Sequence, residues 1–406
     1  MPVISIFSGT FCKEEPIISS IHKAAGKELV ADKDVVAEAS RLSGIAEAKI
    51  DKAFSAKTSV FNKFTHEREH SIAYLKLALA QILAGDELVI AGFVGQLIPR
   101  DVSHVLRVCL IADMKTRVSG AAESQDIAES EAIKIIHKQD EDRASWTHTL
   151  FNCNDPWDTS LYDIIIPTDK MGTEDVVALI IENSEKEAIK KTEQSTSAVE
   201  DFLLAANVEV ALVKEGHNVG VGAKKGSVTL TIDKHVLMLS RLESELASIV
   251  ENLPGVQSVE TKVGPGFHRT DIYRKYDFEK PSKILLVDDE REFVQTLSER
   301  LLMREMGSAV TYDGESALEL VKEDEPDVMI LDLKMPGIDG IEVLRKIKET
   351  QPQIEVIILT GHGSETDRET CMNLGAFAYL HKPVDINELS NTIKKANEKI
   401  HQKKAK

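Results

Sequence analysis

Short apolar runs alternate with longer amphipathic stretches through the last third of the chain. The runs have the length and composition of buried strands, and they lie at residues 284–287, 309–312, 328–331, 356–359 and 378–380. Strands that alternate with helical patterns predict a parallel sheet covered by helices. The final helix has a marked start, because Asp385 can cap it and Glu388 completes a capping box. Residues 282–406 are therefore expected to form one α/β domain.

A similar alternation predicts another parallel α/β domain over residues 1–190. Its strand candidates are the apolar runs 3–7, 88–90 and 105–111. The charged stretch 182–191 is expected to be its last helix. The most apolar stretch of the chain, residues 72–94, carries three charged residues, so it is too polar to span a bilayer.

Residues 197–268 show a mixed pattern that predicts a small α+β domain. Its expected elements are a helix within 235–250 and strands at 208–213, 228–232 and near Val259. A turn at Lys225-Gly226 is expected just before the middle strand. A segment rich in Gly, Pro and charge, residues 269–281, is expected to link this domain to the last one.

The composition narrows the classes of protein that such domains could form. The chain has 406 residues, 42% hydrophobic and 29% charged, which is typical of soluble globular domains. Its formal net charge of −18 repels phosphate backbones, so nucleic acid is not an expected partner. The four cysteines lie far apart and predict neither a zinc site nor a disulfide framework. No signal peptide precedes the first strand, so a cytoplasmic location is expected.

Acidic residues follow two of the predicted strands in the last domain. Asp288 and Asp289 come directly after the first strand, and Asp332 comes directly after the third. The carboxyl ends of parallel strands meet at one edge of a sheet, so these carboxylates should converge. Like charges are costly at close range unless a cation neutralises them, and an oxygen-only cluster suits Mg²⁺.

Two further residues bring complementary groups to the same edge. Thr360 ends the fourth strand, and Lys382 follows the fifth. A carboxylate nucleophile, a divalent cation and a lysine that pairs with phosphate are what phosphoryl transfer to a carboxylate requires. Asp332 is the expected nucleophile.

Four short motifs in this domain occur in a fixed order. They are Leu286-Val287-Asp288-Asp289-Glu290, residues 331–340, Leu359-Thr360-Gly361 and His381-Lys382-Pro383. Together they closely resemble response-regulator receiver domains, over residues 282–406. The resemblance implies a flavodoxin-like (βα)5 fold. It also implies that a histidine kinase or a phosphotransfer protein phosphorylates Asp332.

The same resemblance implies a ligand set for the metal. Mg²⁺ would lie on Asp289 and Asp332, with Asp288 binding through water and the backbone carbonyl of Lys334 as a further ligand. A cis-type turn is expected at Lys382-Pro383.

Thr360 and Tyr379 resemble the switch pair of the receiver family. The resemblance implies that the hydroxyl moves toward the phosphate and that the ring turns inward. Such a movement would shift a pre-existing equilibrium between two surfaces of the domain.

The first domain resembles a different family. The resemblance rests on its opening strand and loop, on 34–39 with Ser43-Gly44, and on residues 107–112 with Arg117, 140–143 and 155–166. These features are similar to the cytidylate-kinase-like branch of nucleoside monophosphate kinases. The resemblance implies a P-loop fold that binds ATP and a nucleotide acceptor such as CMP.

The phosphate loop departs from the GxxxxGK[ST] pattern that such kinases use. Aligning Lys13 with the lysine of the motif puts Phe7 and Cys12 at its glycine positions, and Glu14 where a hydroxyl should hold Mg²⁺. Kinase activity is therefore less favoured than nucleotide sensing, protein binding or a purely structural role. The candidate nucleotide-binding residues are Gly9, Lys13, Arg107, Arg117 and Arg143.

Two other patterns give weaker functional predictions. His66 and His70 have the HExxH zinc spacing, but charged residues at its centre and the lack of a third ligand favour a charged helix face. Residues 197–263 resemble a BON-type module in their hydrophobic pattern. That resemblance implies contact with phospholipid or a small ligand, of which lipid contact is disfavoured without a signal peptide. The favoured alternative is a spacer or dimerising domain.

These patterns together predict a two-component signalling protein. Phosphorylation of Asp332 would alter how the receiver packs against the upstream domains or a partner. No helix-turn-helix signal lies upstream, so the expected output is not transcription. One rival is a nucleotide kinase that the receiver regulates, and another is an adaptor that binds a nucleotide without turnover. The sequence leaves a homodimer open.

Overall fold

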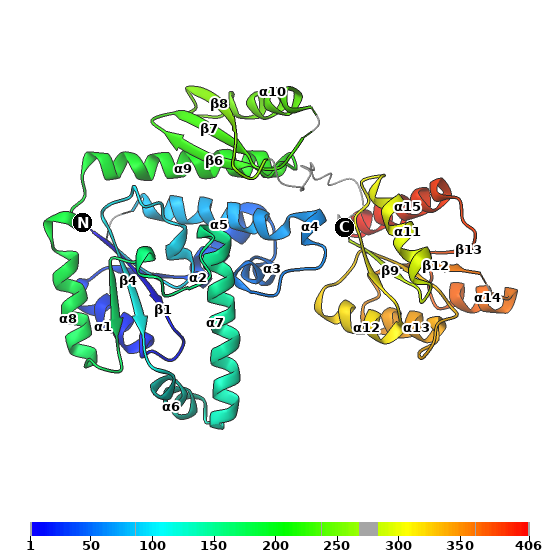
Figure 1. Cartoon of the computed structure of the whole chain (residues 1–406), viewed down its shortest axis with the longest axis horizontal. Helices are drawn as coiled ribbons and strands as arrows, with labels where there is room; N and C mark the ends of the chain where they lie inside the picture. Colours follow the sequence, from blue (N-terminus) through cyan, green and yellow to red (C-terminus); the bar gives the residue numbers. More distant parts are fainter. Residues whose placement is uncertain (1, 86, 237, 268–282, 362, 405–406) are drawn as a thin grey trace. The chain divides into compact units, whose positions relative to one another are not determined.

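The computed structural model describes residues 2–85, 87–236, 238–267, 283–361 and 363–404. The chain divides into two compact units (Figure 1). The first unit consists of Met1–Thr58 with Glu67–Lys275, and the second of Ser59–His66 with Tyr276–Lys406. The expected linker, residues 269–281, lies outside the described residues.

A five-stranded parallel sheet forms the centre of the first unit, in the order β2-β3-β1-β4-β5. Its strands are β1 (Val3–Ser8), β2 (Glu28–Ala31), β3 (Leu88–Ala91), β4 (Val105–Ile111) and β5 (Ile164–Pro167). The three expected strands are confirmed. The edge strand β2 was not expected, because it is only four residues long and half of these are exposed.

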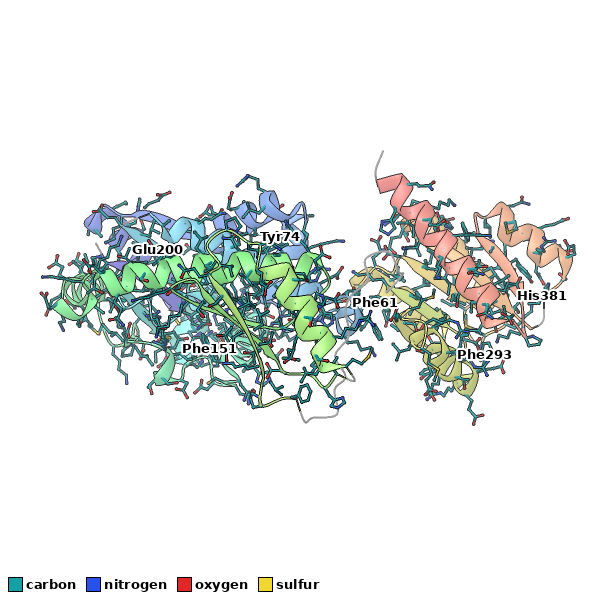
Figure 2. The ribbon with its side chains drawn as sticks, turned by 90° about the horizontal axis from the view of Figure 1, so that it is seen from above. Phe61, Tyr74, Phe151, Glu200, Phe293 and His381 are labelled. Carbon is teal, nitrogen blue, oxygen red and sulfur yellow. The ribbon has the colours of Figure 1, made fainter. Side chains whose placement is uncertain are left out.

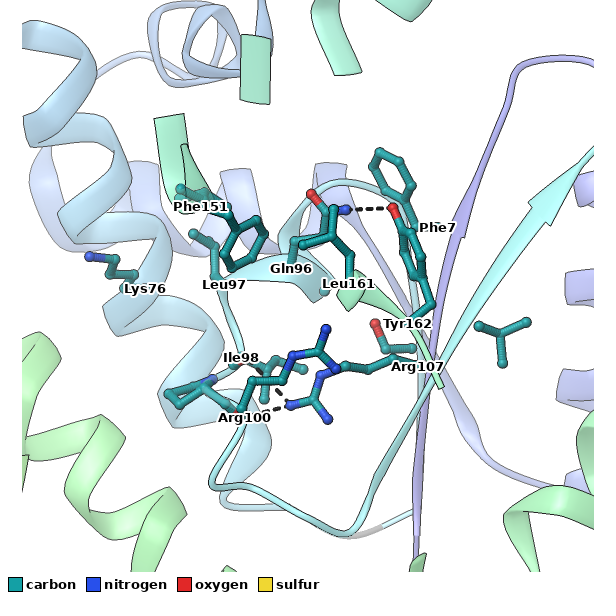
Figure 3. Close-up of a pocket in the computed structure, with 15 residues that line it drawn as sticks. Phe7, Lys76, Gln96, Leu97, Ile98, Arg100, Arg107, Phe151, Leu161 and Tyr162 are labelled. Atoms are coloured by element: carbon teal, nitrogen blue, oxygen red, sulfur yellow. Dashed lines mark hydrogen bonds between the residues drawn. The ribbon is translucent and has the colours of Figure 1, made fainter. Parts of the chain in front are cut away.

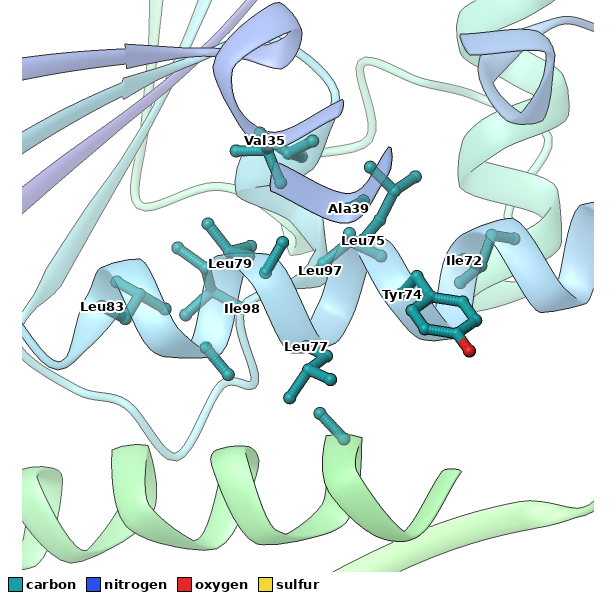
Figure 4. Packing of buried hydrophobic residues seen from close by; sticks show 14 of the residues in the cluster. Val35, Ala39, Ile72, Tyr74, Leu75, Leu77, Leu79, Leu83, Leu97 and Ile98 are labelled. Carbon is teal, nitrogen blue, oxygen red and sulfur yellow. The ribbon is translucent and has the colours of Figure 1, made fainter. Parts of the chain in front are cut away.

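Helices cover both faces of this sheet. On one face, α1 (Glu14–Ala25) and α8 (Thr173–Ser184) pack around the even-numbered residues of β1. On the other face lie α2 (Asp32–Ser43), α5 (Glu67–Leu83) and the buried Trp146. Figure 4 shows why α5 is so apolar: Leu75 and Leu79 point toward α2, whereas Leu77 points the opposite way.

The remaining helices of this part of the chain are peripheral or short. Trp146 belongs to α7 (Glu129–Phe151), which packs against α6 (Met114–Gln125). The short helices are α3 (Glu47–Asp51), η1 (Lys52–Phe54), η2 (Val94–Leu97), η3 (Thr159–Leu161) and η4 (Glu187–Ile189). The short helix α4 (Asn62–Thr65) belongs to the second unit. No helix within the described ranges has the length and apolarity to cross a bilayer.

The expected helix over residues 182–191 is wrong. Helix α8 ends at Ser184, and only the single turn of η4 follows it. None of the three residues of η4 is buried, so no apolar face holds a longer helix there.

A smaller three-stranded sheet, in the order β6-β7-β8, completes the first unit. Its elements are β6 (Gly220–Lys224), β7 (Ser227–Ile232), α10 (Leu239–Val250) and β8 (Ser258–Val263). The expected turn is confirmed: β6 and β7 form an antiparallel hairpin through Lys225 and Gly226. Both turn residues have positive φ, 49° and 81°, which a two-residue hairpin of this hand requires. Strand β8 pairs with β7 in parallel.

The expected strand at 208–213 is also wrong, because these residues lie in the long helix α9 (Glu193–Lys214). Val208 and Leu212 pack against the small sheet, whereas Val210 and Val213 join the core that contains α5. Figures 1 and 2 show α9 running along the first α/β layer. The alternating apolar pattern arose because this helix is buried on two sides.

The second unit has a parallel sheet in the order β10-β9-β11-β12-β13, which is the flavodoxin-like order. Its strands are β9 (Ile284–Val287), β10 (Ser308–Thr311), β11 (Val328–Leu331), β12 (Glu355–Thr360) and β13 (Ala378–His381). All five expected strands are confirmed within a residue at either end.

Five helices flank this sheet. On one face are α11 (Arg291–Leu302) and α15 (Ile386–Lys404), and on the other are α12 (Gly314–Glu323), α13 (Gly340–Thr350) and α14 (Glu365–Asn373). The expected cap of α15 is confirmed, because the Asp385 carboxylate accepts the backbone N–H of Asn387 at 2.7 Å.

Candidate functional site

The three expected acidic residues converge at the carboxyl edge of the second unit's sheet. Strands β9 and β11 are neighbours with Val287 opposite Leu331, so the residues that follow them lie side by side. Candidate ligand atoms of Asp288, Asp289 and Asp332 all lie within 4.8 Å of one another. The sequence therefore predicted this cluster correctly.

The chemistry of this cluster fits a hard divalent cation. Asp288 and Asp332 are almost completely buried, with 4% and 5% of their surfaces exposed, whereas Asp289 is exposed. Oδ1 of Asp332 is buried and has no hydrogen-bond partner within the described part of the chain. A buried acceptor of this kind needs a partner, and a cluster of carboxylate oxygens suits Mg²⁺. The role of the Lys334 carbonyl stays a prediction.

Lys382 lies beside the cluster, as the sequence predicted. Its Nζ lies 2.7 Å from Oδ2 of Asp288 and 3.9 Å from Oδ2 of Asp332. Burial by itself would lower the pKa of Lys382, but hydrogen bonds to Asp288 and Glu290 raise it above its ordinary value. Burial raises the pKa of Asp288, and its hydrogen bond with Lys382 opposes that change. The Lys382-Pro383 peptide bond is cis, as expected.

Glu290 is a member of the site that the sequence did not single out. Its carboxylate accepts a hydrogen bond from Nζ of Lys382 at 3.0 Å. The same Nζ lies 4.5 Å from the centre of the Phe293 ring. The position of Glu290, directly after the two aspartates, was the signal that could have indicated it.

Thr360 and Tyr379 also come together near this edge. Thr360 is fully buried at the end of β12, and Tyr379 lies on the neighbouring strand β13. The Tyr379 hydroxyl is buried beside Gly363, where a β-carbon added to the glycine would lie 1.7 Å from it and 3.1 Å from Cγ2 of Thr360. Within the described residues this hydroxyl has no hydrogen-bond partner. The ring therefore points inward, next to the threonine.

Gly9 and Lys13 lie in the loop that joins β1 to α1, at the carboxyl edge of the first unit's sheet. Polar groups of this loop form hydrogen bonds with other groups of the protein. The N–H of Phe11 donates to the Glu14 carboxylate at 3.1 Å, and Nζ of Lys13 donates to the carbonyl of Thr168 at 3.3 Å. The glutamate at the hydroxyl position therefore closes back on the loop.

Two of the expected phosphate-binding arginines hold this loop. Arg117 donates to the carbonyl of Thr10 at 2.8 Å and makes a two-pronged ion pair with Asp140. Arg143 donates to the carbonyl of Ser8 at 2.7 Å. Arg107 lies elsewhere, and its guanidinium donates to backbone carbonyls that include that of Pro99.

The HExxH spacing does not lie on one continuous helix. His66 ends α4 with a left-handed backbone (φ 51°), and α5 begins at Glu67. The acidic cluster is the one group of three or more metal-binding side chains found in the described part of the chain.

Comparisons with known proteins match two parts of the chain. Residues 284–394 match the response regulator receiver domain, and residues 20–170 match the cytidylate kinase-like family. The second match begins after the β1–α1 loop. The chain therefore contains a receiver domain homologous to those of response regulators, together with a cytidylate-kinase-like region, in one α/β multidomain protein.

Curated relatives match through the receiver domain. The transcriptional regulatory protein CpxR of Escherichia coli K12 is 42% identical over 120 residues, which are 30% of this chain and 51% of that protein. The response regulator MprA of Mycolicibacterium vanbaalenii is 36% identical over 109 residues, 27% of this chain and 47% of that protein. The chain thus spans about half the length of the curated relatives it matches.

Solved structures match the same region. A receiver domain protein from Clostridium thermocellum is 37% identical and covers 30% of this chain and 96% of its own, with a TM-score of 0.28. A CheY-like receiver domain protein from Methanospirillum hungatei is 25% identical, with the same coverage of both chains and a TM-score of 0.29.

Proposed function

We propose that this protein is a response regulator that accepts a phosphoryl group on Asp332 from a histidine kinase or a phosphotransfer protein. The observation that carries the proposal is the buried Oδ1 of Asp332, which has no partner in the described residues. The carboxylate that bears it clusters with two other aspartates and lies 3.9 Å from Nζ of Lys382. The receiver homology supports the same role.

Asp288, Asp289 and Asp332 would hold Mg²⁺, with the Lys334 carbonyl as a further ligand and Asp288 binding through water. The bound cation would supply positive charge that offsets the carboxylates and the incoming phosphate.

In the reaction, a carboxylate oxygen of Asp332 attacks the phosphorus of the phosphorylated donor. The bond between phosphorus and the donor histidine breaks, and the imidazole leaves with the electron pair and takes up a proton. Lys382 already lies within 4 Å of Asp332, so its ammonium can pair with an oxygen of the new acyl phosphate. The Thr360 hydroxyl would then approach the phosphate, and the inward position of Tyr379 would become more populated.

The first unit acts, in this proposal, as a sensor or output module that does not bind DNA. Its β1–α1 loop uses its own Phe11 N–H and Lys13 ammonium in contacts with the protein, which leaves a poor cradle for nucleotide phosphates. The alternative is a cytidylate-like nucleotide kinase that the receiver regulates, which the match over residues 20–170 favours. Turnover of ATP and CMP by the full chain would support that alternative.

The test is acid-labile labelling of the full chain by a small phosphodonor such as acetyl phosphate, with and without Mg²⁺. Wild type should be labelled only with Mg²⁺, and Asp332→Asn should not be labelled. Glu349→Gln, which removes an exposed carboxylate from α13, is the matched control and should label like wild type. Full labelling of Asp332→Asn would show that the acceptor is a different residue.

A further inference from the structure

A cavity of about 200 Å³ lies in the first unit, at the middle of β1 and β4 rather than at the β1–α1 loop (Figure 3). Much of its wall is apolar or aromatic, with contributions from Phe7, Leu97, Phe151, Leu161 and Tyr162. Binding sites for small molecules commonly combine such walls with a few polar groups. The polar side chains of this cavity are those of Ser5, Lys76, Gln96, Arg100, Arg107 and Tyr162.

Arg107 enters the cavity as a nearly buried cation, with 9% of its surface exposed. Its guanidinium donates to the backbone carbonyls of Pro99, Val105 and Ile98, at 2.7, 3.3 and 3.4 Å. No carboxylate of the described chain makes an ion pair with it. Burial and, to a smaller extent, the charge of Arg100 lower the pKa of Arg107 to about 10, and the charge of Asp163 opposes them. A nearly buried cation that makes no ion pair is costly, although the charge of Asp163 partly offsets it, and this makes Arg107 a candidate for a functional group.

Arg100 brings a second guanidinium next to that of Arg107, as Figure 3 shows. Its Nη1 lies 4.0 Å from Oδ1 of Asp163, at the limit of an ion pair. Lys76 also lines the cavity, but its ammonium is paired with Glu209 at 2.8 Å. Two guanidiniums against one aspartate, with the lysine neutralised, leave one positive charge. One bound anion would therefore balance the charge of the cavity.

Gln96 adds an unused acceptor. Its Nε2 donates to the hydroxyl of Tyr162 at 2.9 Å, which fixes the orientation of the amide. Its Oε1 is buried and has no hydrogen-bond partner among the residues that the structure describes. A ligand that carries an N–H or O–H group would satisfy this oxygen.

We infer that this cavity is a binding site for a small organic oxyanion, a phosphate ester or a carboxylate. Its anionic group lies between Arg100 and Arg107, because paired guanidiniums match the geometry of such oxyanions. Its apolar or aromatic body packs against Phe7, Phe151 and Tyr162, and a donor group faces Gln96. Every residue that lines the site belongs to the first unit.

The test is calorimetric titration of the full chain with phenyl phosphate, benzoate and phenol at physiological ionic strength. Phenyl phosphate or benzoate should bind saturably, and phenol, which lacks the anion, should not. The stronger of the two anions identifies the oxyanion class. Saturable binding of neither anion at millimolar concentration would overturn the proposal.

Two arginine variants and one control variant test where the anion binds. Arg100→Gln removes a charge from a half-exposed side chain, so it should fold normally and bind at least about ten-fold more weakly. Lys134→Gln removes an exposed cation from α7 and should bind like wild type. Arg107→Met should abolish binding, and circular dichroism would show whether it keeps its fold. Equal affinity of wild type and Arg100→Gln would place the bound anion outside this cavity.

Discussion

The ammonium nitrogen of Lys382 lies 2.7 Å from Oδ2 of Asp288, so the buried carboxylate has a cationic partner before any metal or phosphate arrives. The same nitrogen is 3.9 Å from Asp332, close enough to move toward a phosphate formed there. In the proposed function, Lys382 would therefore stabilise the acidic cluster in the resting state and pair with the product in the phosphorylated state. The stability of the receiver and its phosphorylation would then both depend on Lys382.

Replacing Lys382 with methionine should destabilise the metal-free protein. Asp288 would lose the cation that compensates its buried charge, at a cost of about 1–3 kcal/mol. Mg²⁺ should recover much of this loss, because it would supply positive charge to the folded state alone. Thermal unfolding of wild type and Lys382→Met, each with and without Mg²⁺, measures both effects.

Lys394→Met is the control for that comparison, since Lys394 is exposed on α15 and lies away from the cluster. It should unfold like wild type under both conditions. A Lys382→Met variant as stable as wild type without Mg²⁺ would show that the contact with Asp288 contributes nothing to folding.

Thr360→Ala should leave phosphorylation of Asp332 largely intact and weaken its structural consequence. The hydroxyl is expected to bind the phosphate rather than to take part in the transfer. Hydrogen exchange of β13 and α14, compared before and after treatment with acetyl phosphate, would report the change. Thr366→Ala, on the exposed part of α14, serves as the control. Identical phosphate-induced changes in wild type and Thr360→Ala would count against the switch role.

Gly363→Ala should expel the Tyr379 ring from its inward position. The added β-carbon would lie 1.7 Å from the tyrosine hydroxyl, which is impossible without a movement of the ring. Burial raises the pKa of Tyr379, so the pKa should fall toward its ordinary value once the ring is exposed. NMR of a fluorinated tyrosine at this position would follow the ring and its ionisation.

Gly361→Ala is a close control for that substitution. Its added β-carbon would meet only carbon atoms of Lys382, at 3.9 Å, which is ordinary contact. It should leave the Tyr379 signal unchanged. If Gly363→Ala also left the signal unchanged, the inward position of the ring would be in doubt.

Asp32 should make the stability of the first unit depend on pH. Burial raises the pKa of Asp32 to about 6, although its carboxylate accepts the N–H groups of Phe93 and Val94. The folded state therefore holds this proton at a pH where the unfolded state has lost it. Its contribution to stability is fully present below about pH 4 and is lost as the pH rises through about 6.

The measurement is thermal unfolding of wild type and Asp32→Asn from acidic to neutral pH. The difference between them should change by up to about 3 kcal/mol over this range, with wild type relatively weaker at neutral pH. Asp101→Asn, which removes an exposed carboxylate, should show no such trend. A constant difference between wild type and Asp32→Asn would contradict the raised pKa.

The receiver site could be predicted from the sequence because its parts are local. Asp288, Asp332 and Thr360 each stand at the end of an apolar run, and the parallel sheet then brings strand ends together whatever the loops do. The inward position of the Tyr379 ring could not be predicted in this way. Its inward position depends on Gly363, which comes from a different segment.

Helix α9 shows where local patterns mislead. The alternating run around Val208 and Val210 is typical of a strand that is buried on one face. In the structure these two valines serve two different cores on opposite sides of one helix. Periodicity alone cannot separate these cases, because it does not record how many surfaces cover an element.

By itself, the sequence determined the positions of the receiver's five strands along the chain and the identity of its acidic edge, since each strand and motif there is contiguous in the sequence. Only the tertiary structure decided the roles of the arginines in the first unit. Arg117 and Arg143 hold the β1–α1 loop, whereas Arg107 faces a separate cavity beside Arg100. The physical reason is that a cation's role is set by the charges and carbonyls around it, and these come from segments far apart in the chain.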